Sequence, residues 1–221
     1  MAKRQTELEV SLPELTVVTD LELAAEDTYD ALELRDLDLS GQSAPRSRFI
    51  ECGLYDCLLD DTILRGARLS ECILDGLRAT AIDLAGSSWS GVVATGGRIG
   101  ALSVHGGTLD RVRVSGAKID FLNARGARLS DVQFEGCRLG EVHLGEAELS
   151  RVSFVDCQIE QLELSGARLD EVDLSRAQLH FIEGLGSLAG AVISDEQLTD
   201  LAPAFAEHLK IRVVERRRPV G

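Results

Sequence analysis

Apolar residues recur at every fifth position through most of this chain, a spacing that neither an α-helix nor a single β-strand produces. The register runs from Leu34 to Leu179 without a slip, and all thirty positions in it are apolar. A helix brings side chains to one face about every 3.6 residues and a strand every two, so a larger repeating unit sets this period. We call these thirty positions the central ladder.

The residue two positions before each ladder residue is also distinctive. It is small in the segments GARL, GAKI and GCRL, as at Ala67, Ala117 and Cys137, and larger in intervening pentads, as at Val132 and Val152. Two residues separated by one lie on the same side of an extended segment. Each pentad therefore predicts one short side of a coil. Four sides give a coil of about twenty residues, and successive coils stack like parallel strands.

Glycines fall at two opposite corners of this predicted coil. One series is Gly66, Gly86, Gly106, Gly126 and Gly166, and the other is Gly76, Gly96, Gly116 and Gly136. Glycine accepts the positive φ that the third residue of a type II turn requires. We expect type II turns at these two corners, another turn type at the other pair, and a cross-section with two-fold character.

These features resemble the pentapeptide-repeat proteins, whose family pattern is Ala-Asp/Asn-Leu-X-X. The resemblance covers residues 32–181 and implies an all-β solenoid, a right-handed quadrilateral parallel β-helix of about seven 20-residue coils with a C-terminal helical cap. One departure is that Arg often precedes the central Leu, as in GARL, where the family has Asp or Asn.

All five cysteines occupy the inward position two before a ladder residue. They are Cys52, Cys57, Cys72, Cys137 and Cys157. Two pairs, Cys52 with Cys72 and Cys137 with Cys157, lie one coil apart. Their backbones are then about 4.8 Å from each other, a distance that a disulfide can bridge. Parallel side-chain directions and a reducing cytosol favour free thiols, and an odd number without CxxC spacing argues against a disulfide framework or a zinc site. We expect them to be buried and to act as small hydrophobic side chains.

Residues 1–31 precede the ladder and are acidic, with eight Asp or Glu against two Lys or Arg. The stretch ELTVVTDLEL alternates partly and is expected to pair with or cover the first coil, since an open end would expose unpaired backbone groups. An inward Gln42 and a corner Pro45 predict that the first coil is bulged. Five apolar residues near this end are expected to face outward: Ile50, Tyr55, Leu58, Ile63 and Ile73. They lie either beneath the N-terminal segment or in an exposed partner-binding patch.

Residues 182–221 predict a helix, a short extended segment and a basic tail, ERRRPVG. Ser194 and Gln197 have the spacing of a capping box, and apolar residues then follow helical spacing. Pro203 is expected to kink this helix or to split it in two. The helix either covers the last coil or forms a homodimer, as the resemblance to the quinolone-resistance branch of the family implies. The candidate contacts for both roles are Leu198, Leu201 and Phe205.

Composition fits an aliphatic core and argues against several functions. Hydrophobic residues make up 44% of the chain and aromatic residues 4%. No apolar run is long enough to span a membrane, and no apolar stretch follows the charged start as in a signal peptide, so we expect a cytoplasmic location.

The four histidines are scattered, no catalytic grouping or phosphate-binding motif occurs, and flat walls offer no deep pocket. We therefore expect no enzymatic activity, no metal site and no cofactor.

Charge is distributed unevenly along a chain whose net charge is −14. Residues 131–175 carry eleven acidic and three basic residues, whereas residues 91–130 carry two acidic and six basic residues. Nine acids, which we call the acidic set, form a candidate partner-binding surface: Glu141, Glu146, Glu148, Asp156, Glu160, Glu163, Asp170, Glu171 and Asp173. Four basic residues spaced by twenty predict a basic stripe up one side: Arg78, Arg98, Lys118 and Arg138. The stripe is either a row of solvated side chains, paired with Asp120 or Glu141, or a recognition surface for an acidic partner.

These features favour a non-enzymatic protein–protein interaction module with an unidentified protein partner and without direct nucleic acid or membrane binding. The resemblance to the quinolone-resistance branch implies an alternative, an acidic mimic of B-form DNA that binds a type II topoisomerase such as DNA gyrase. The density of acidic residues over 131–175 matches the charge density of B-DNA, about one charge per 1.7 Å. The net basic segment 91–130 interrupts this match, so the DNA mimic requires a dimer that extends the acidic run. A second alternative is a passive scaffold that binds through the apolar N-terminal surface.

Overall fold

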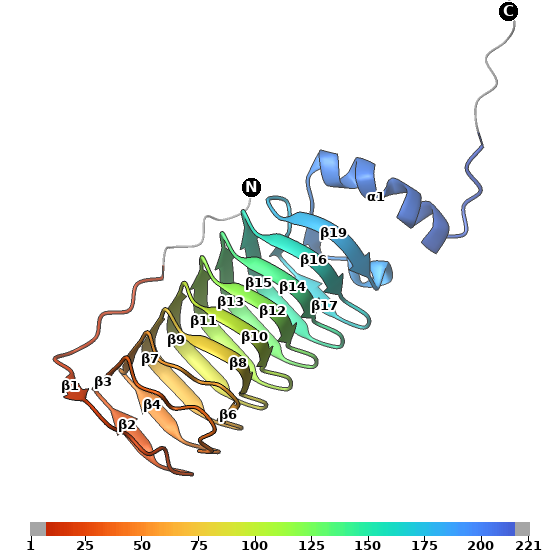
Figure 1. Cartoon of the computed structure of the whole chain (residues 1–221). Coiled ribbons are helices and arrows are strands. Elements are labelled where there is room, and N and C mark those ends of the chain that lie inside the picture. The colour runs from red at the N-terminus through yellow and green to blue at the C-terminus, as the bar shows by residue number, and fades with distance from the viewer. Residues whose placement is uncertain (1–7, 215–221) are drawn as a thin grey trace, which may run out of the picture.

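The computed structural model of the chain describes residues 8–214, which wind into a rod of stacked coils (Figure 1). Leu129 pairs in parallel with Leu149, and Leu149 with Leu169, in direct register. This stacking confirms the twenty-residue coil predicted from the five-residue period. The fold is a parallel β-solenoid of about nine turns with a single C-terminal helix, so the expected number of about seven coils was too low.

Two parallel sheets form the walls of the rod. The larger sheet consists of β1 (Thr16–Val18), β2 (Thr28–Asp30), β3 (Leu32–Arg35), β4 (Arg48–Ile50), β5 (Gly53–Tyr55), β7 (Arg68–Asp75), β9 (Ser88–Thr95), β11 (Thr108–Ser115), β13 (Arg128–Glu135), β15 (Glu148–Val155), β17 (Arg168–Asp170), β18 (Val172–Asp173) and β20 (Ala191–Val192). The smaller sheet consists of β6 (Thr62–Ile63), β8 (Arg78–Asp83), β10 (Arg98–Ser103), β12 (Lys118–Asn123), β14 (Arg138–His143), β16 (Gln158–Glu163) and β19 (Gln178–Glu183). Each central coil adds one eight-residue strand to the larger sheet and one six-residue strand to the smaller, so the two halves of the coil differ and the two-fold cross-section is only approximate.

The central ladder fills the interior of the rod. Twenty-six of its thirty residues are buried and the other four are half-buried, which confirms the inward face predicted from the sequence. Phe134 and Phe154 stack with ring centroids 4.9 Å apart, and the buried indole N–H of Trp89 donates to Ser87 Oγ at 2.9 Å. An elongated apolar void of about 100 Å³ runs through the core beside Ala94 and Ala124.

The four corners of the coil differ from one another. At the corner of Gly66 the amide of Ala67 donates to the carbonyl oxygen of Leu64, and only the third residue of the turn has positive φ. This is the predicted type II turn. At the corner of Gly76 the φ is also positive, but no such backbone hydrogen bond closes the turn among the described residues. The type II turn at this corner stays a prediction.

The other two corners need no glycine. At one of them residues with side chains, such as Glu71 and Asp131, adopt positive φ. The other lies within the continuous strands of the smaller sheet, as at Ala101 in β10. Glycine therefore marks only part of the coil's left-handed backbone positions.

The solenoid begins before the ladder does. β2 pairs with β4 at an offset of twenty residues, and Tyr29 is buried against Phe49 at a ring distance of 4.9 Å. β1 then pairs with β3, as expected for a strand that covers the first coil. The inward Gln42 joins this segment to the coil, since its Nε2 donates to Leu21 O at 3.2 Å and its Oε1 accepts from the amide of Leu23 at 2.6 Å.

At the other end the chain leaves the coils through a 3-10 helix, η1 (Leu185–Ser187), and α1 (Asp195–His208). Ser194 and Gln197 form both bonds of the predicted capping box. The helix runs through Pro203 as a single element, which excludes the expected alternative of two short helices and leaves the kink at Pro203 as a prediction. Proline removes one donor from the ladder of helical hydrogen bonds, and the remaining residues sustain the helix. The predicted basic tail, 215–221, lies outside the described residues.

Candidate binding surfaces

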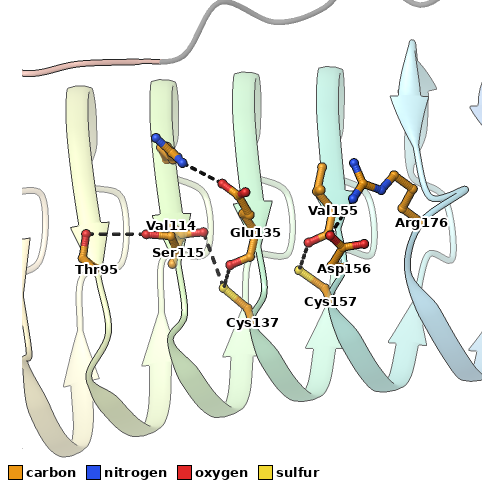
Figure 2. Close-up of polar contacts among 10 residues, drawn as sticks. Thr95, Val114, Ser115, Glu135, Cys137, Val155, Asp156, Cys157 and Arg176 are labelled. Atoms are coloured by element: carbon orange, nitrogen blue, oxygen red, sulfur yellow. Dashed lines mark hydrogen bonds and ion pairs between the residues drawn. The ribbon is translucent and has the colours of Figure 1, made fainter.

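The five cysteines lie inside the rod, as predicted, and are free and buried. Three of them donate to the carbonyl oxygen of a ladder residue in the preceding coil, as Cys137 does to Val114 O at 3.4 Å (Figure 2), and Cys52 donates in the same way to Tyr29 O. Thr62 Oγ1 makes the same bond to Leu39 O at 3.0 Å. Burial raises the pKa of Cys72 to about 12. A thiol that is buried and protonated at neutral pH is a poor nucleophile, so Cys72 serves packing.

The acidic set is distributed around the whole rod. Glu141, Glu160 and Glu163 belong to strands of the smaller sheet, and Glu148, Asp170 and Asp173 to strands of the larger sheet. Glu146, Asp156 and Glu171 occupy corners with positive φ. The acids therefore do not form one anionic face, although their density along the sequence suggested it.

Several of these acids are also engaged by basic side chains. Glu148 pairs with both Arg128 and Arg168 in the neighbouring coils, and Asp156 pairs with Arg176 across one coil at 2.5 Å (Figure 2). Such exposed ion pairs add little stability, but they neutralise part of the charge that a DNA mimic would present.

Glu163 differs from the others because it is buried. Its Oε1 accepts from the amide of Ser165 at 2.7 Å, and Arg125 lies 3.8 Å from its Oε2. Burial alone would raise the pKa of Glu163, but the hydrogen bonds from Ser165 and the charges of Arg125 and His143 outweigh burial and lower it. Glu163 is thus held ionised within the wall, which suits a structural role.

The five apolar residues expected near the N-terminal end do not form a patch. Their positions in the coil place them on different walls, and only Ile63 is exposed; Ile50, Tyr55, Leu58 and Ile73 are half-buried. The guanidinium of Arg35 lies 4.3 Å above the ring of Tyr55. The prediction of a single exposed apolar surface was wrong because only one of the five residues is exposed and because they are divided between the two sheets.

The basic stripe forms as predicted. Arg78, Arg98, Lys118 and Arg138 are register partners on β8, β10, β12 and β14. Lys118 pairs with Asp120 at 3.1 Å, whereas Glu141 lies beside His143 at 3.4 Å. Within the described residues, 8–214, the three arginines of the stripe are exposed and have no ion-pair partner. Like charges stacked about 4.8 Å apart repel one another, so the stripe would be stabilised by an external anion.

A hollow lies beside the stripe on the outer face of the same strands. Its floor is formed by Ala81 and Ala101, which are register partners, and Phe121 follows in the next coil. Ile63 lies at the opposite end, and Asp83 and Ser103 line the far side. The space amounts to about 320 Å³. The sequence analysis missed this hollow, although two alanines twenty residues apart at outward positions were a visible signal.

The C-terminal end carries most of the exposed apolar side chains. Of nine large hydrophobic residues that are exposed in the described chain, seven follow residue 180: Phe181, Val192, Leu198, Leu209, Ile211, Val213 and Val214. Leu201 packs against the core and, like Phe205, is half-buried, while Leu198 points to solvent with 54% exposure. Among the three candidate contacts, the helix therefore uses Leu201 to cover the last coil and leaves Leu198 uncovered.

The described residues, 8–214, contain no group of three or more His, Cys, Asp or Glu placed to hold a metal ion. They also contain no helix with the length and apolar character needed to cross a membrane.

Comparisons with known proteins agree with the coil geometry. Residues 127–161 match the family model described as pentapeptide repeats, in 8 copies. A trypsin-treated form of QnrB1, a plasmid-mediated fluoroquinolone resistance protein, is 14% identical, with 85% of this chain and 100% of that chain covered and a TM-score of 0.31.

HetL, a pentapeptide-repeat protein involved in heterocyst differentiation regulation from the cyanobacterium Nostoc sp. strain PCC 7120, is 20% identical. That comparison covers 77% of this chain and 91% of HetL, with a TM-score of 0.36. No curated protein matches the sequence. The superpositions are too loose to transfer the role of any residue to this chain.

Proposed function

Because this chain is a pentapeptide-repeat protein, we propose that it is a non-enzymatic protein-binding rod whose basic stripe recognises an acidic partner. The observation that carries the proposal is the column of Arg78, Arg98 and Arg138, which are exposed in register and lack an ion-pair partner within residues 8–214. Most other basic side chains on the walls are paired, as Arg151 is with Asp131 at 2.7 Å. A column left unpaired in a chain of net charge −14 supports a binding role.

The test is retention of proteins from a cell extract on three immobilised forms of the rod. The double variant R78E/R98E reverses the stripe, and R48E/R68E makes the same charge change on a matched pair of exposed, register-paired arginines in the larger sheet. We expect partners that bind the parent and R48E/R68E but not R78E/R98E. Identical retention by all three forms would refute a role for the stripe.

We propose in addition that the rod forms a homodimer through its C-terminal end. Support comes from the uncovered Leu198 on α1 and from Phe181, which is 54% exposed on β19, the terminal strand of the smaller sheet. Apolar side chains gathered at one end favour association. Light scattering on the parent and on Leu198→Glu tests this: we expect a dimer mass for the parent and a monomer mass for the variant. A monomeric parent contradicts the dimer.

The topoisomerase alternative makes a separate prediction. The dispersal of the acidic set over both sheets and three corners does not favour a DNA mimic. A gyrase supercoiling assay with the parent and with charge reversal at the exposed Glu146 and Glu160 decides it. Salt-sensitive inhibition that the reversals weaken supports the mimic, and no effect at micromolar protein eliminates it.

A further inference from the structure

The outer face of the smaller sheet combines two surfaces that the coil brings together. Strand β10 carries Arg98 at its start and Ala101 three residues later, and β8 repeats this order with Arg78 and Ala81. The stripe and the floor of the hollow are thus about 10 Å apart on the same two strands. A ligand that spans this distance would contact both.

Little side-chain bulk separates the two surfaces at β10. Gly100 stands between Arg98 and Ala101, and a Cβ there would collide with the carbonyl oxygen of Thr80. The corner glycine before the stripe, Gly96, has open space where a Cβ would point. The wall therefore carries no side chain at positions 96 and 100, on either side of Arg98, which lets an extended chain lie close to it.

The hollow itself selects an apolar group. Ala81 and Ala101 leave a floor of methyl groups, and Phe121 and Ile63 stand at its two ends, about three coil spacings or 14 Å apart. Such a space accepts one large apolar side chain. On its far side Asp83 is already paired with Arg65 at 2.6 Å. Asp61 lines the end of the hollow near Ile63, so the carboxylates of a ligand would lie away from that end, toward Arg78 and Arg98.

We propose that β8 and β10 bind an extended acidic segment of a partner protein, with an aromatic or large aliphatic residue in the hollow and flanking carboxylates on Arg78 and Arg98. This rests on the proposed function and specifies its ligand. In an extended segment side chains two residues apart point to the same side, so a carboxylate two positions from the apolar residue faces the stripe while the apolar residue enters the hollow.

A polypeptide fits this site better than a nucleic acid does. The stripe spans only about 14 Å, and acids border it at both ends, with Asp60 beside β8 and Glu160 on β16. A long polyanion would meet these carboxylates and the net charge of −14. A short segment with two or three carboxylates contacts the arginines alone.

The experiment uses fluorescence anisotropy with the full chain and four labelled probes. The first is the peptide Asp-Glu-Phe-Glu-Asp with Gly-Ser flanks; the second replaces its Phe with Ala; the third replaces its acids with the matching amides; the fourth is a ten-nucleotide single-stranded DNA. We expect the first peptide to bind, the second and third each to bind at least tenfold more weakly, and the binding to weaken with salt.

Matched protein variants locate the site. The variant R78E/R98E is expected to bind the first peptide more than tenfold more weakly than the parent does, whereas R48E/R68E is expected to bind it as tightly as the parent. Ala101→Leu fills the hollow and is expected to weaken the Phe peptide but not the Ala peptide, while Thr108→Leu on the larger sheet changes neither. Circular dichroism melting confirms that each variant is folded.

The outcomes separate this inference from the function on which it rests. If both acidic peptides bind the stripe equally well, the hollow is not an anchor site and the inference fails while stripe recognition stands. If no peptide binds the parent, or R48E/R68E loses binding as R78E/R98E does, both fail. Tighter binding of the DNA than of the first peptide overturns the choice of a polypeptide ligand.

Discussion

Gln42 and Gln197 perform the same task at opposite ends of the rod: each uses a side-chain amide to join a terminal segment to the backbone of an outer coil. Gln42 bonds to Leu21 O and to the amide of Leu23. Gln197 Nε2 donates to Leu174 O at 2.8 Å and to Ala177 O at 2.7 Å, while its Oε1 accepts from the amide of Ser194 at 2.9 Å. An amide suits this position because it both donates and accepts.

Replacing Gln197 by alanine should therefore destabilise the C-terminal end. The carbonyl oxygens of Leu174 and Ala177 would lose a donor, a cost of about 1–3 kcal/mol. We expect a lower midpoint of urea unfolding and faster amide exchange in α1, with Gln178→Ala, which changes an exposed glutamine of β19, as the control. Equal effects of the two substitutions would show that Gln197 does not hold the cap.

The pair of Trp89 and Ser87 offers a test inside the core. Both residues are buried, and the indole N–H donates to Ser87 Oγ. Ser87→Ala leaves that N–H unsatisfied and should cost about 1–3 kcal/mol of unfolding free energy. In a Trp89→Phe background the same change should cost much less, because no donor remains. A cost that is unchanged in that background would contradict the assignment.

The void in the core predicts a stabilising substitution. Ala94 lines it, between its register partners Leu74 and Val114. Ala94→Val should add about 1 kcal/mol to the free energy of unfolding by filling space. Ala127→Val, at a fully buried position that does not line the void, should instead cost about 1–3 kcal/mol through overpacking. Thermal denaturation of both variants measures the difference, and shifts of the same sign would refute the void.

Asp131 and Arg151 predict a dependence on pH. Arg151 donates to both carboxylate oxygens of Asp131 at 2.7 Å, and this hydrogen bonding, together with the charge of Arg151, lowers the pKa of Asp131. Because the folded pKa lies below the unfolded one, the pair stabilises the fold above the unfolded pKa, about 3.9, and loses that contribution as pH falls through the folded pKa.

Arg151→Gln should raise the pKa of Asp131 toward its ordinary value in an NMR titration. The stability difference between parent and variant should shrink as the solution is acidified from about pH 6 to below the folded pKa. Arg168→Gln, which leaves this pair intact, is the control. An unchanged pKa of Asp131 in Arg151→Gln would exclude the pairing in solution.

The sequence predicted whatever depends on the twenty-residue period. The stacking of Leu129 on Leu149, the buried cysteines and the basic stripe all follow from one register that never slips between Leu34 and Leu179. The same register assigns each residue to a side of the coil, so the dispersal of the acidic set and of the five apolar residues was also available from it. The local density of acidic or apolar residues along the sequence predicted their grouping in space less well than their position within the twenty-residue coil did.

Other features depend on interactions that no period encodes. β1 pairs with β3 at an offset of sixteen residues and β18 with β20 at nineteen, so the first and last turns fall outside the pattern. The corner at Glu71 adopts positive φ without glycine, because neighbouring coils fix its backbone. The hollow arises from missing side-chain volume at Ala81 and Ala101, which a search for charged or catalytic residues does not detect.

The claim that the smaller sheet binds an acidic segment is tested most directly by locating the bound peptide. A benzophenone amino acid placed at exposed Thr80, between the stripe and the hollow, is compared with the same group at exposed Thr108 in the larger sheet. After irradiation with the Phe-containing acidic peptide, mass spectrometry should find the cross-link from position 80 and not from position 108. Equal labelling from both positions, or labelling from position 108 alone, would contradict the claim.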